Sequence, residues 1–476
     1  MSELLRLGAR EMVERLRRRE ISPVEAVRAS LERIAATDAA LNAVPTVCAE
    51  RALAHARRIE SGAAEARPRA WLGGLPIVVK DLNDVAGVRT TYGSPLFADH
   101  VPEASDAMVL TLEANGAVVV GKANTPEFGH GANTFNEVFG KTRNPWNTAM
   151  TCGGSSGGSA VAVATGQAWL ATGSDLGCSL RTPASFCSVV GLRPSPGRIA
   201  RSRVRLPFDT LWVQGPIARN VGDVALMLDA MAGHHPADPL SFPAPETPFL
   251  AALDRPVPPR RVAYSRDLGG LTPVAAEVAG ICAAAAARFA EIGATVEEAC
   301  PDLRDARDIF RDLRANQLVG DLAPIVDANR ERVRPEVLWN MDLGKKLDAG
   351  RLAAAERGRG ALYARAAAFF DSWDLLVTPA AIVAPFDVDI RALDEVEGVK
   401  LPNYYEWYAI AYAITLTSLP AIVVPCGFTR AGLPVGLQVV GPPRGEARLL
   451  AAAALMEQVF GIAARLPIDP RPGVAR

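Results

Sequence analysis

The sequence predicts an α/β fold. Apolar runs at residues 75–79 and 117–120 have the length and composition of short buried strands. A helical pattern over residues 105–115 precedes the second run, and the order helix, short loop and strand is typical of helices packed on a sheet. With 49% apolar and 22% charged residues, the chain also has the composition of an ordinary globular protein.

The N-terminal part begins with helices. Over the first 60 residues the pattern is helical, and Ser22-Pro23-Val24-Glu25 forms a capping box that starts a helix reaching about Ile34. Ser105 is expected to cap a helix that ends at Asn115, before Gly116. These helices would flank the two predicted strands.

The second half of the chain differs from the first in composition and in its expected elements. Asn220 is expected to cap a helix over residues 221–232, and five prolines among residues 234–249 then indicate an irregular connection. Thr272-Pro273 is expected to start an alanine-rich helix, and residues 303–370 are mostly helical and arginine-rich. Further strands are expected at residues 375–377, 421–425 and 433–440, the last two as neighbours, followed by a closing helix over residues 449–460.

Charge and cysteine content restrict the class of protein. The net charge of −1 argues against a nucleic-acid partner, which would require a basic face. Seven scattered cysteines without a C-x-x-C motif indicate reduced thiols in a cytoplasmic protein, with neither disulfides nor a zinc framework. The first residues lack the apolar region of a signal peptide. The longest apolar stretch, residues 408–428, contains Pro420 and Pro425, which favours buried core over a membrane span.

A run of small residues is the most informative local feature. The segment Gly153-Gly154-Ser155-Ser156-Gly157-Gly158-Ser159 consists of four glycines and three serines, which let a backbone turn tightly and bring hydroxyl and N–H groups close to a small molecule. A second cluster follows at residues 173–181, after an apolar run over residues 160–172. Two hydroxyl-bearing turns that flank one buried element predict the two halves of a catalytic site.

Three other interpretations of this run are weaker. The run is too short for a flexible linker between domains and lacks the Lys-Ser/Thr ending of a phosphate-binding loop. Residues 154–158 match the G-x-S-x-G pattern of a nucleophile elbow, with Ser156 as the nucleophile. That mechanism needs a histidine further along the chain, and only His234 and His235 follow, both in the proline-rich connection.

Lysine is the better candidate for a general base. The five histidines form no metal-binding spacing, and a serine nucleophile can be served by lysine instead. Only six of the 51 basic residues are lysines, and Lys80 alone directly follows an apolar run. A desolvated lysine can lose its charge near neutral pH and accept a proton. The alternative, left open by the local sequence, is an ion pair of Lys80 with Asp81 or Asp84.

Several further motifs follow one another in order along the chain. They are Gly74-Leu75-Pro76-Ile77-Val78-Val79-Lys80-Asp81, Asn124-Thr125-Pro126-Glu127-Phe128-Gly129, Thr142-Arg143-Asn144-Pro145-Trp146-Asn147, Gly173-Ser174-Asp175-Leu176-Gly177-Cys178-Ser179-Leu180-Arg181, Phe186-Cys187-Ser188-Val189-Val190-Gly191-Leu192-Arg193-Pro194, Gly215-Pro216-Ile217-Ala218-Arg219 and Leu433-Pro434-Val435-Gly436-Leu437-Gln438. Together with the glycine–serine run they resemble the amidase signature family. The resemblance covers most of the chain and is weakest over about residues 236–370.

The resemblance implies an α/β fold with a single large domain over residues 1–476, in which helices cover both faces of a central mixed β-sheet. Its parts would be N-terminal helices (1–65), the signature core (66–233), a proline-rich connection with a variable helical region (234–370) and the C-terminal part of the core (371–476). The sequence leaves open whether the helical region is a subdomain or an insertion on the one sheet.

The resemblance also implies a set of catalytic residues. Ser179 would be the nucleophile, Ser155 the bridging serine after a cis peptide bond from Gly154, and Lys80 the base. The spacing of the three residues matches the family pattern. The backbone N–H groups of four residues would form the oxyanion hole: Leu176, Gly177, Cys178 and Ser179. Three further residues would position these loops: Ser156, Asp175 and Arg181. No metal or organic cofactor is implied.

Cys178 departs from the family pattern, which usually has a second glycine before the nucleophile. The backbone N–H is retained, so the oxyanion hole can be retained too. The thiol is expected to fill a gap in the structure and not to narrow the pocket. Cys178 as the nucleophile is the alternative that a substitution would test.

The substrate is less defined than the reaction. Aromatic residues are the candidates for a pocket, namely Phe128, Phe208, Trp212, Tyr404 and Trp407, and no carboxylate site lined by Asp or Arg is visible. The sequence therefore predicts hydrolysis of small aryl or alkyl amides, with carbamates also possible (urethanase-type), by a cytoplasmic monomer or homodimer without nucleic-acid or membrane partners.

Two alternatives remain. The first is a glutamine-hydrolysing amidotransferase subunit, but the polar residues usual in that branch are replaced by Thr182 after Arg181 and by Leu206-Pro207-Phe208-Asp209-Thr210-Leu211-Trp212. The second is a catalytically silent member of the family that acts as a binding protein. The complete Lys–Ser–Ser set argues against it.

Overall fold

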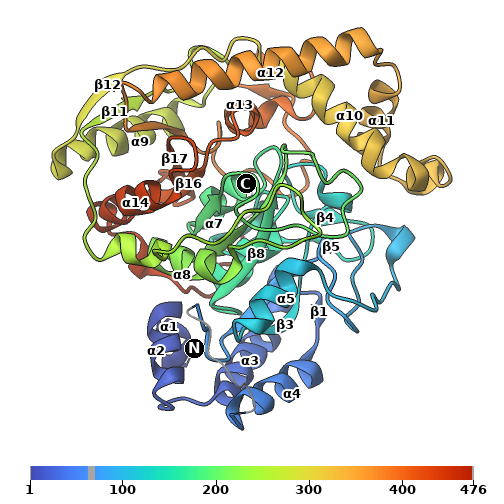
Figure 1. Ribbon diagram of the computed structural model, residues 1–476, viewed down its shortest axis with the longest axis vertical. Coiled ribbons are helices and arrows are strands. Elements are labelled where there is room, and N and C mark those ends of the chain that lie inside the picture. The colour runs from blue at the N-terminus through green and yellow to red at the C-terminus, as the bar shows by residue number, and fades with distance from the viewer. Residues whose placement is uncertain (1, 63–69, 474–476) are drawn as a thin grey trace.

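A mixed β-sheet runs through the molecule and contains 11 strands in residues 2–62 and 70–473, which the computed structural model describes (Figure 1). The strand order is β1-β3-β2-β8-β10-β9-β16-β17-β13-β11-β12. Parallel pairs such as β2 with β3 and β8 occur beside antiparallel pairs such as β16 with β17. Because strands from both halves of the chain share this sheet, the chain forms one domain, and the predicted α/β fold is confirmed.

The strands of the main sheet are short. Their bounds are β1 Thr46–Val47, β2 Pro76–Lys80, β3 Val118–Ala123, β8 Leu170–Asp175, β9 Val190–Arg193, β10 Val213–Ala218, β11 Arg261–Tyr264, β12 Thr295–Glu298, β13 Leu375–Pro379, β16 Ala421–Phe428 and β17 Pro434–Val440. Three small two-stranded sheets lie outside it: β4 Phe135–Asn136 with β5 Gly140–Lys141, β6 Arg143–Asn144 with β7 Asn147–Thr151, and β14 Glu395–Val396 with β15 Val399–Lys400.

Helices surround the sheet. Their bounds are α1 Glu3–Arg6, α2 Ala9–Arg17, α3 Pro23–Leu41, α4 Ala49–Glu60, α5 Ala107–Ala114, α6 Gly157–Ala164, α7 Arg181–Cys187, α8 Val221–Met231, α9 Ala276–Ala287, α10 Ala306–Val326, α11 Pro335–Gly344, α12 Ala349–Phe369, α13 Ala409–Leu416 and α14 Glu446–Phe460. Short 3₁₀ turns occupy Pro95–Phe97, Glu127–Gly129, Phe249–Leu253, Arg288–Ile292, Arg330–Arg332, Glu406–Tyr408 and Ala463–Arg465. None of the described helices combines the length and apolar character that crossing a membrane requires.

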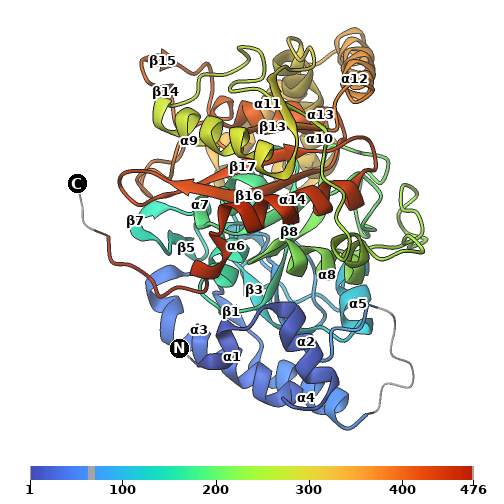
Figure 2. The same ribbon diagram turned by 90° about the vertical axis from the view of Figure 1, so that its left-hand side faces the viewer.

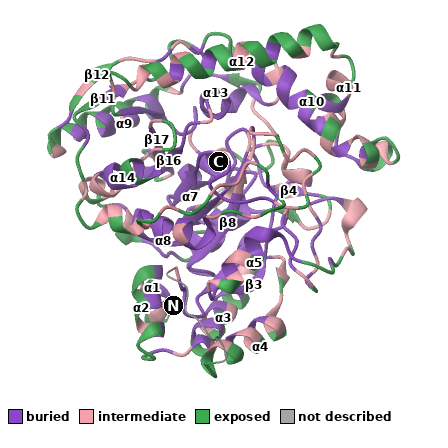
Figure 3. Cartoon of the chain, in the orientation of Figure 1, coloured by how far each residue is buried: buried purple, intermediate pink, exposed green. Residues whose placement is uncertain are grey.

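Both faces of the sheet are covered, as the resemblance implied. All five residues of β2 are buried, and its side chains alternate between two hydrophobic clusters. Ile77 and Val79 belong to the cluster that includes α2, α5, α8 and α14, whereas Val78 belongs to the cluster of α3, α4 and α6. A strand with helices on both faces has no solvent side, which explains its continuous apolar run. Figure 3 shows buried residues concentrated in the sheet and exposed ones on the outer helices.

The variable region is continuous with the sheet. Strands β11 and β12 extend one edge of the sheet, and α10 packs against α11, α12 and α13. In Figures 1 and 2 these helices lie at the opposite end of the molecule from α1–α4. Residues 303–370 are mostly helical, as predicted. The expected boundary between residues 65 and 66 lies outside the described residues.

The predicted caps are partly correct. Ser22 Oγ accepts a hydrogen bond from the backbone N–H of Glu25, and Asn220 caps α8 through the N–H of Asp223, as predicted. Ser105 is not the cap of α5: Asp106 occupies that position, and Ser105 Oγ instead accepts from the N–H of Ala86 at 2.9 Å. A local pattern places a helix end well, but the tertiary partner of each hydroxyl decides which residue caps it.

Two predicted elements have different bounds. The alanine-rich helix begins at Ala276 and not at Thr272-Pro273. The apolar run over residues 160–172 is not a single element, because α6 ends at Ala164 and β8 begins at Leu170. Gly166 lies in the connection with a φ of +75°, a conformation that glycine adopts without strain.

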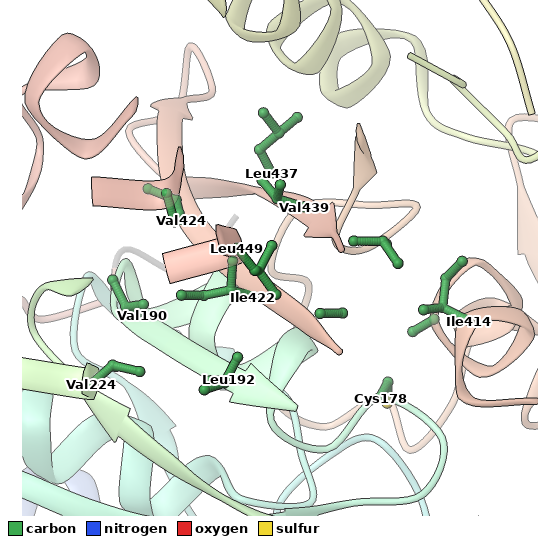
Figure 4. Close-up of a cluster of buried hydrophobic side chains, with 14 of the residues drawn as sticks. Cys178, Val190, Leu192, Val224, Ile414, Ile422, Val424, Leu437, Val439 and Leu449 are labelled. Atoms are coloured by element: carbon green, nitrogen blue, oxygen red, sulfur yellow. The ribbon is translucent and has the colours of Figure 1, made fainter. Parts of the chain in front are cut away.

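We expect Ile422→Ala to destabilise the fold by about 2–5 kcal/mol, because it removes packed atoms from a fully buried position of β16. Figure 4 shows Ile422 in the buried cluster that also contains Leu449 of α14. Urea denaturation followed by circular dichroism measures the change. The matched control is Ile390→Ala, at a position that is 42% exposed, with an expected change within about 0.5 kcal/mol. Equal losses in the two variants would contradict the described core.

Candidate active site

Lys80 lies at the end of β2, where its amine hydrogen-bonds three hydroxyl groups. Its Nζ donates to the Oγ atoms of Ser155 at 2.7 Å, Ser156 at 2.9 Å and Ser174 at 3.0 Å. The side chain is fully buried. Because β2 and β8 are parallel, their carboxyl ends meet at one edge of the sheet, and this brings Lys80 close to Ser174 of β8.

The carboxylates near Lys80 in sequence have other partners. Asp81 pairs with the buried Lys122 at 2.8 Å, and Asp84 accepts a hydrogen bond from the hydroxyl of Tyr92. The alternative of an ion pair between Lys80 and Asp81 or Asp84 is therefore wrong. Burial lowers the pKa of Lys80 to about 7, against the opposing effect of the Asp175 charge. A large fraction of Lys80 is thus neutral at neutral pH.

The glycine–serine run forms a tight turn at the start of α6. The Gly154–Ser155 peptide bond is cis, as the resemblance implied. A Cβ atom at Gly158 would lie 2.4 Å from the backbone nitrogen of Asn124, which explains the glycine at this position. The N–H of Ser156 donates to the carbonyl of Ser179 at 3.2 Å and so links the two small-residue turns.

Ser179 lies in the turn between β8 and α7 and lines a cavity of about 370 Å³ together with Ser155 and Ser174. Its exposed fraction is 7%, against 1% for Ser155. Among the described residues no hydrogen bond joins the two hydroxyls. The structure therefore connects Lys80 to Ser155 directly and places Ser179 in the same cavity.

Asp175 and Arg181 hold the turn that carries Ser179. The guanidinium of Arg181 donates to both carboxylate oxygens of Asp175, at 2.7 and 3.0 Å, and to the carbonyl of Gly177 at 3.0 Å. Arg193 donates to the same carboxylate at 3.1 Å. Burial alone would raise the pKa of Asp175, but the two arginines outweigh this effect and lower it to about 2. Asp175 is therefore charged at any working pH.

The backbone before Ser179 offers free donors. The N–H of Leu180 donates to Asp175, whereas the hydrogen bonds of the described residues use none of the N–H groups of Leu176, Gly177, Cys178 and Ser179. Leu176, Gly177, Cys178 and Ser179 also line the cavity. Gly177 packs against Tyr408, since a Cβ at Gly177 would lie 2.8 Å from the Tyr408 ring.

Cys178 is a buried thiol. It is 1% exposed and belongs to the hydrophobic cluster drawn in Figure 4, which agrees with a gap-filling side chain. Burial raises the pKa of Cys178 to about 12, so the nucleophilic thiolate is scarce at neutral pH. The histidines required by the nucleophile-elbow alternative lie elsewhere: His234 contacts Ser241, and His235 is in the same connection.

The predicted aromatic residues divide into two groups. Phe128 and Trp212 line the cavity. Phe208 does not, because its side chain is 75% exposed to solvent. Trp407 is buried against Phe186 and Phe386, away from the cavity lining, and its neighbour Tyr408 faces the cavity instead.

Tyr404 also lies outside the cavity lining, although it contacts a residue that belongs to it. Its ring lies beneath the guanidinium of Arg314, with 5.7 Å from Cζ to the ring centroid. Tyr404 and the Arg314 guanidinium both hydrogen-bond the side chain of Asn340. Tyr404 therefore supports the cavity wall without forming it.

Arg314 is a cavity residue that the sequence did not reveal. It comes from α10, is 3% exposed and lines the cavity beside His130. Arginines therefore line the cavity, although no carboxylate site lined by Asp or Arg was visible in the sequence. No sequence signal distinguished Arg314, because it lies in an arginine-rich helical segment whose neighbours, such as Arg311, form ion pairs nearer the surface.

His130 is neutral in this setting. Burial, together with the charges of Arg314 and Arg334, lowers the pKa of His130 well below its ordinary value. Its Nδ1 lies 3.2 Å from Nη2 of Arg314. Because the guanidinium can only donate, Nδ1 accepts and the ring proton resides on Nε2.

Known proteins are similar to this chain over most of its length. The family described as Amidase matches residues 25–450. A glutamyl-tRNA(Gln) amidotransferase subunit from Anaeromyxobacter dehalogenans (strain 2CP-C) is 37% identical, with 99% of each chain covered. An acylamidase of Rhodococcus erythropolis is 34% identical, with 97% of each chain covered.

Solved structures share the fold over nearly the whole chain. A bacterial aryl acylamidase of the amidase signature family superposes with a TM-score of 0.89 at 26% identity, covering 97% of this chain and 99% of that chain. A 6-aminohexanoate cyclic dimer hydrolase in complex with substrate gives 0.87 at 27% identity, with the same coverage. The corresponding glutamyl-tRNA(Gln) amidotransferase subunit of Thermotoga maritima gives 0.73 at 26% identity, covering 96% and 95%. The family match and the extent of these similarities show that the chain belongs to the amidase signature family of amidohydrolases.

Proposed function

We propose that this protein hydrolyses C–N bonds of small aryl or alkyl amides through an acyl-enzyme on Ser179, with Ser155 as the bridging serine and Lys80 as the base. The observation that carries the proposal is the environment of Lys80. A fully buried amine whose hydrogen-bond partners among the described residues are all hydroxyl groups, with a pKa of about 7, is suited to accept a proton from serine.

The proton would move in two steps. Neutral Lys80 accepts the proton of Ser155, and Ser155 accepts the proton of Ser179 as the Ser179 oxygen attacks the amide carbonyl. For this transfer the two hydroxyls must approach to hydrogen-bond distance, a shift that commonly accompanies substrate binding. The tetrahedral oxyanion would be held by the N–H groups of residues 176–179, which donate no hydrogen bond within the part of the chain that the structure describes.

The relay then runs in reverse. The C–N bond breaks as the proton returns through Ser155 to the nitrogen, and an amine leaves while Ser179 keeps the acyl group as an ester. Water gives its proton to the same relay, attacks the ester and releases the acid, which restores Ser179. Carbamates fit this chemistry as well, with alcohol, carbon dioxide and amine as the final products.

The cavity supports a small organic substrate. Its volume of about 370 Å³ and the rings of Phe128 and Trp212 suit an aryl or alkyl group. The greater structural similarity to the aryl acylamidase than to the Thermotoga maritima protein favours the same choice. All seven cysteines are free, which supports a cytoplasmic location, and we propose that the chain acts as a monomer or homodimer.

A glutamine-hydrolysing amidotransferase subunit is the second candidate. The 37% identity to the Anaeromyxobacter dehalogenans protein favours it. Assays of the purified chain on L-glutamine, acetyl 4-nitroanilide, simple alkyl amides and phenyl carbamates decide between the two. Release of 4-nitroaniline without glutaminase activity supports the acylamidase proposal. Glutaminase activity alone, or activity only after addition of partner chains, contradicts it.

Substitution of the reacting residues should abolish hydrolysis. We expect Lys80→Ala, Ser155→Ala and Ser179→Ala each to lower kcat/KM for an active anilide by at least about 10³-fold, because each removes a member of one relay. Cys178→Ala is the matched control and should retain activity and fluorophosphonate labelling. Labelling of Ser179→Ala, or inactivity of Cys178→Ala in a folded protein, would point to a different nucleophile.

The pH dependence should follow Lys80. Only the neutral amine accepts a proton, and its fraction grows as the pH rises through the pKa of about 7. We therefore expect kcat/KM for an uncharged anilide to rise between about pH 6 and 8 and then level off. Stopped-flow measurement of acyl-enzyme formation separates this step from product release. A profile that is flat or falling over this range would exclude Lys80 as the base.

A further inference from the structure

We propose that Arg314 and His130 form a subsite for a carboxylate carried by the substrate, at a distance of several bonds from the scissile carbonyl. The proposal rests on the proposed function and names the substrate class: amides with an anionic group. Both residues line the cavity that contains Ser155 and Ser179. Neither is part of the proton relay.

The charge of Arg314 lacks a protein counterion. Among the described residues no carboxylate lies within 4.0 Å of its guanidinium, whereas buried Arg181 and Arg193 share Asp175. The partners of Arg314 are neutral: the side chains of Asn340 and His130 and the faces of Tyr404 and Tyr405. Removing a guanidinium from water without a counterion is costly, so a bound anion would supply the missing charge.

The neighbours of Arg314 are arranged to favour an anion over a cation. His130 lines the cavity and uses Nδ1 as acceptor from Arg314, so its Nε2 carries a proton and can serve as a second donor. The contacts with Asn340 and the two tyrosine rings hold the planar guanidinium in place. A fixed guanidinium matches a carboxylate with two parallel hydrogen bonds.

The subsite lies close to the reacting serines. A Cβ at Gly177 would lie 3.8 Å from Phe310 of α10, and Arg314 follows Phe310 by one helical turn, a rise of about 6 Å. On the other side, a Cβ at Gly129 would lie 3.6 Å from Ser155 Oγ, and His130 is the next residue. In a substrate with a short spacer between the scissile carbonyl and the carboxylate, the carboxylate would therefore be able to reach both Arg314 and His130.

Two other arginines line the cavity, and each has an acidic neighbour. Nε of Arg203 lies 4.0 Å from a carboxylate oxygen of Asp84. Burial raises the pKa of Asp321, against the opposing charge of Arg205. Each of these arginines interacts with a carboxyl group of the protein, whereas Arg314 pairs with none among the described residues, which makes Arg314 the better anchor for an anion of the substrate.

The acidic groups of the cavity would favour one orientation of a bound anionic substrate. Asp84 and Asp106 line it together, and Asp321 lies two turns beyond Arg314 on α10. A carboxylate would be repelled from these groups and attracted to Arg314. The anion could belong to the acyl part or to the amine part, and the experiment distinguishes the two sources.

The test compares matched chromogenic amides. On the acyl side the substrates are the 4-nitroanilide of succinic acid, with its second carboxyl free, and the 4-nitroanilide of butanoic acid. On the amine side they are the acetyl amide of 5-amino-2-nitrobenzoic acid and acetyl 4-nitroanilide. We expect the protein to prefer the charged member of one pair by about ten- to hundred-fold in kcat/KM, the range of a charge-assisted hydrogen-bond pair.

Arg314→Gln should remove this preference, so that the charged and the neutral member of the pair react at similar rates. The matched control is Arg311→Gln on the same helix, whose guanidinium pairs with Asp308 and Asp312, and it should keep the preference. Equal rates on both members of both pairs, or a preference that survives in Arg314→Gln, would overturn the subsite. Absence of hydrolysis of every anilide and every alkyl amide, or hydrolysis by Ser179→Ala, would instead refute the proposed function.

A binding measurement keeps the subsite testable without turnover. Calorimetry on Ser179→Ala should detect succinate or glutarate, and Arg314→Gln added to that variant should weaken the binding at least about ten-fold, the effect of one charge-assisted contact. Butyramide serves as the uncharged control ligand. If the Ser179→Ala protein binds neither dicarboxylate, or binds butyramide equally well, the anionic subsite is wrong.

Discussion

The buried carboxylate of Asp175 is the interaction on which the geometry of the site depends. It ends β8, and Arg181 of α7 and Arg193 of β9 both bind it. Arg181 also reaches α13 and β17 through the carbonyl of Ala411 and the side chain of Gln438. One carboxylate and its arginines thus tie together the elements around the turn that carries Ser179. Without it, two buried guanidinium groups would lack compensation, which is far more costly than the loss of a surface ion pair.

The pairing of nearby charged groups with one another also sets the environment of Lys80. Asp81 is adjacent in sequence, yet its carboxylate is held by Lys122 and by the hydroxyl and N–H of Thr91. Lys80 is left among hydroxyl groups, and burial can then act on its pKa without a directly paired anion to restore the charge. Two buried lysines on adjacent parallel strands therefore have different partners: Lys122 pairs with a carboxylate, and Lys80 with hydroxyl groups.

The helical region completes the cavity. The sheet edge supplies Lys80 and the serines, whereas α10 supplies Arg314 from a segment far along the chain. In the proposed mechanism, different layers of the fold would thus carry the chemistry and the recognition of the substrate. A rigid sheet edge maintains the distances between reacting groups, and a covering helix can change its side chains without disturbing them.

Local patterns were sufficient for the strands at β2 and β3, the capping box at Ser22 and the hairpin of β16 and β17. The resemblance to the amidase signature motifs pointed to Lys80, Ser155 and Ser179, and the structure brings the three residues to one place. The tertiary structure alone decided that Phe208 faces solvent, that Tyr408 and not Trp407 reaches the cavity, and that Arg314 has no counterion among the described residues. The physical reason is the separation in sequence of the residues that determine each feature. Caps, turns and strand patterns depend on neighbours in sequence, whereas the lining of a cavity depends on which faces of distant elements meet.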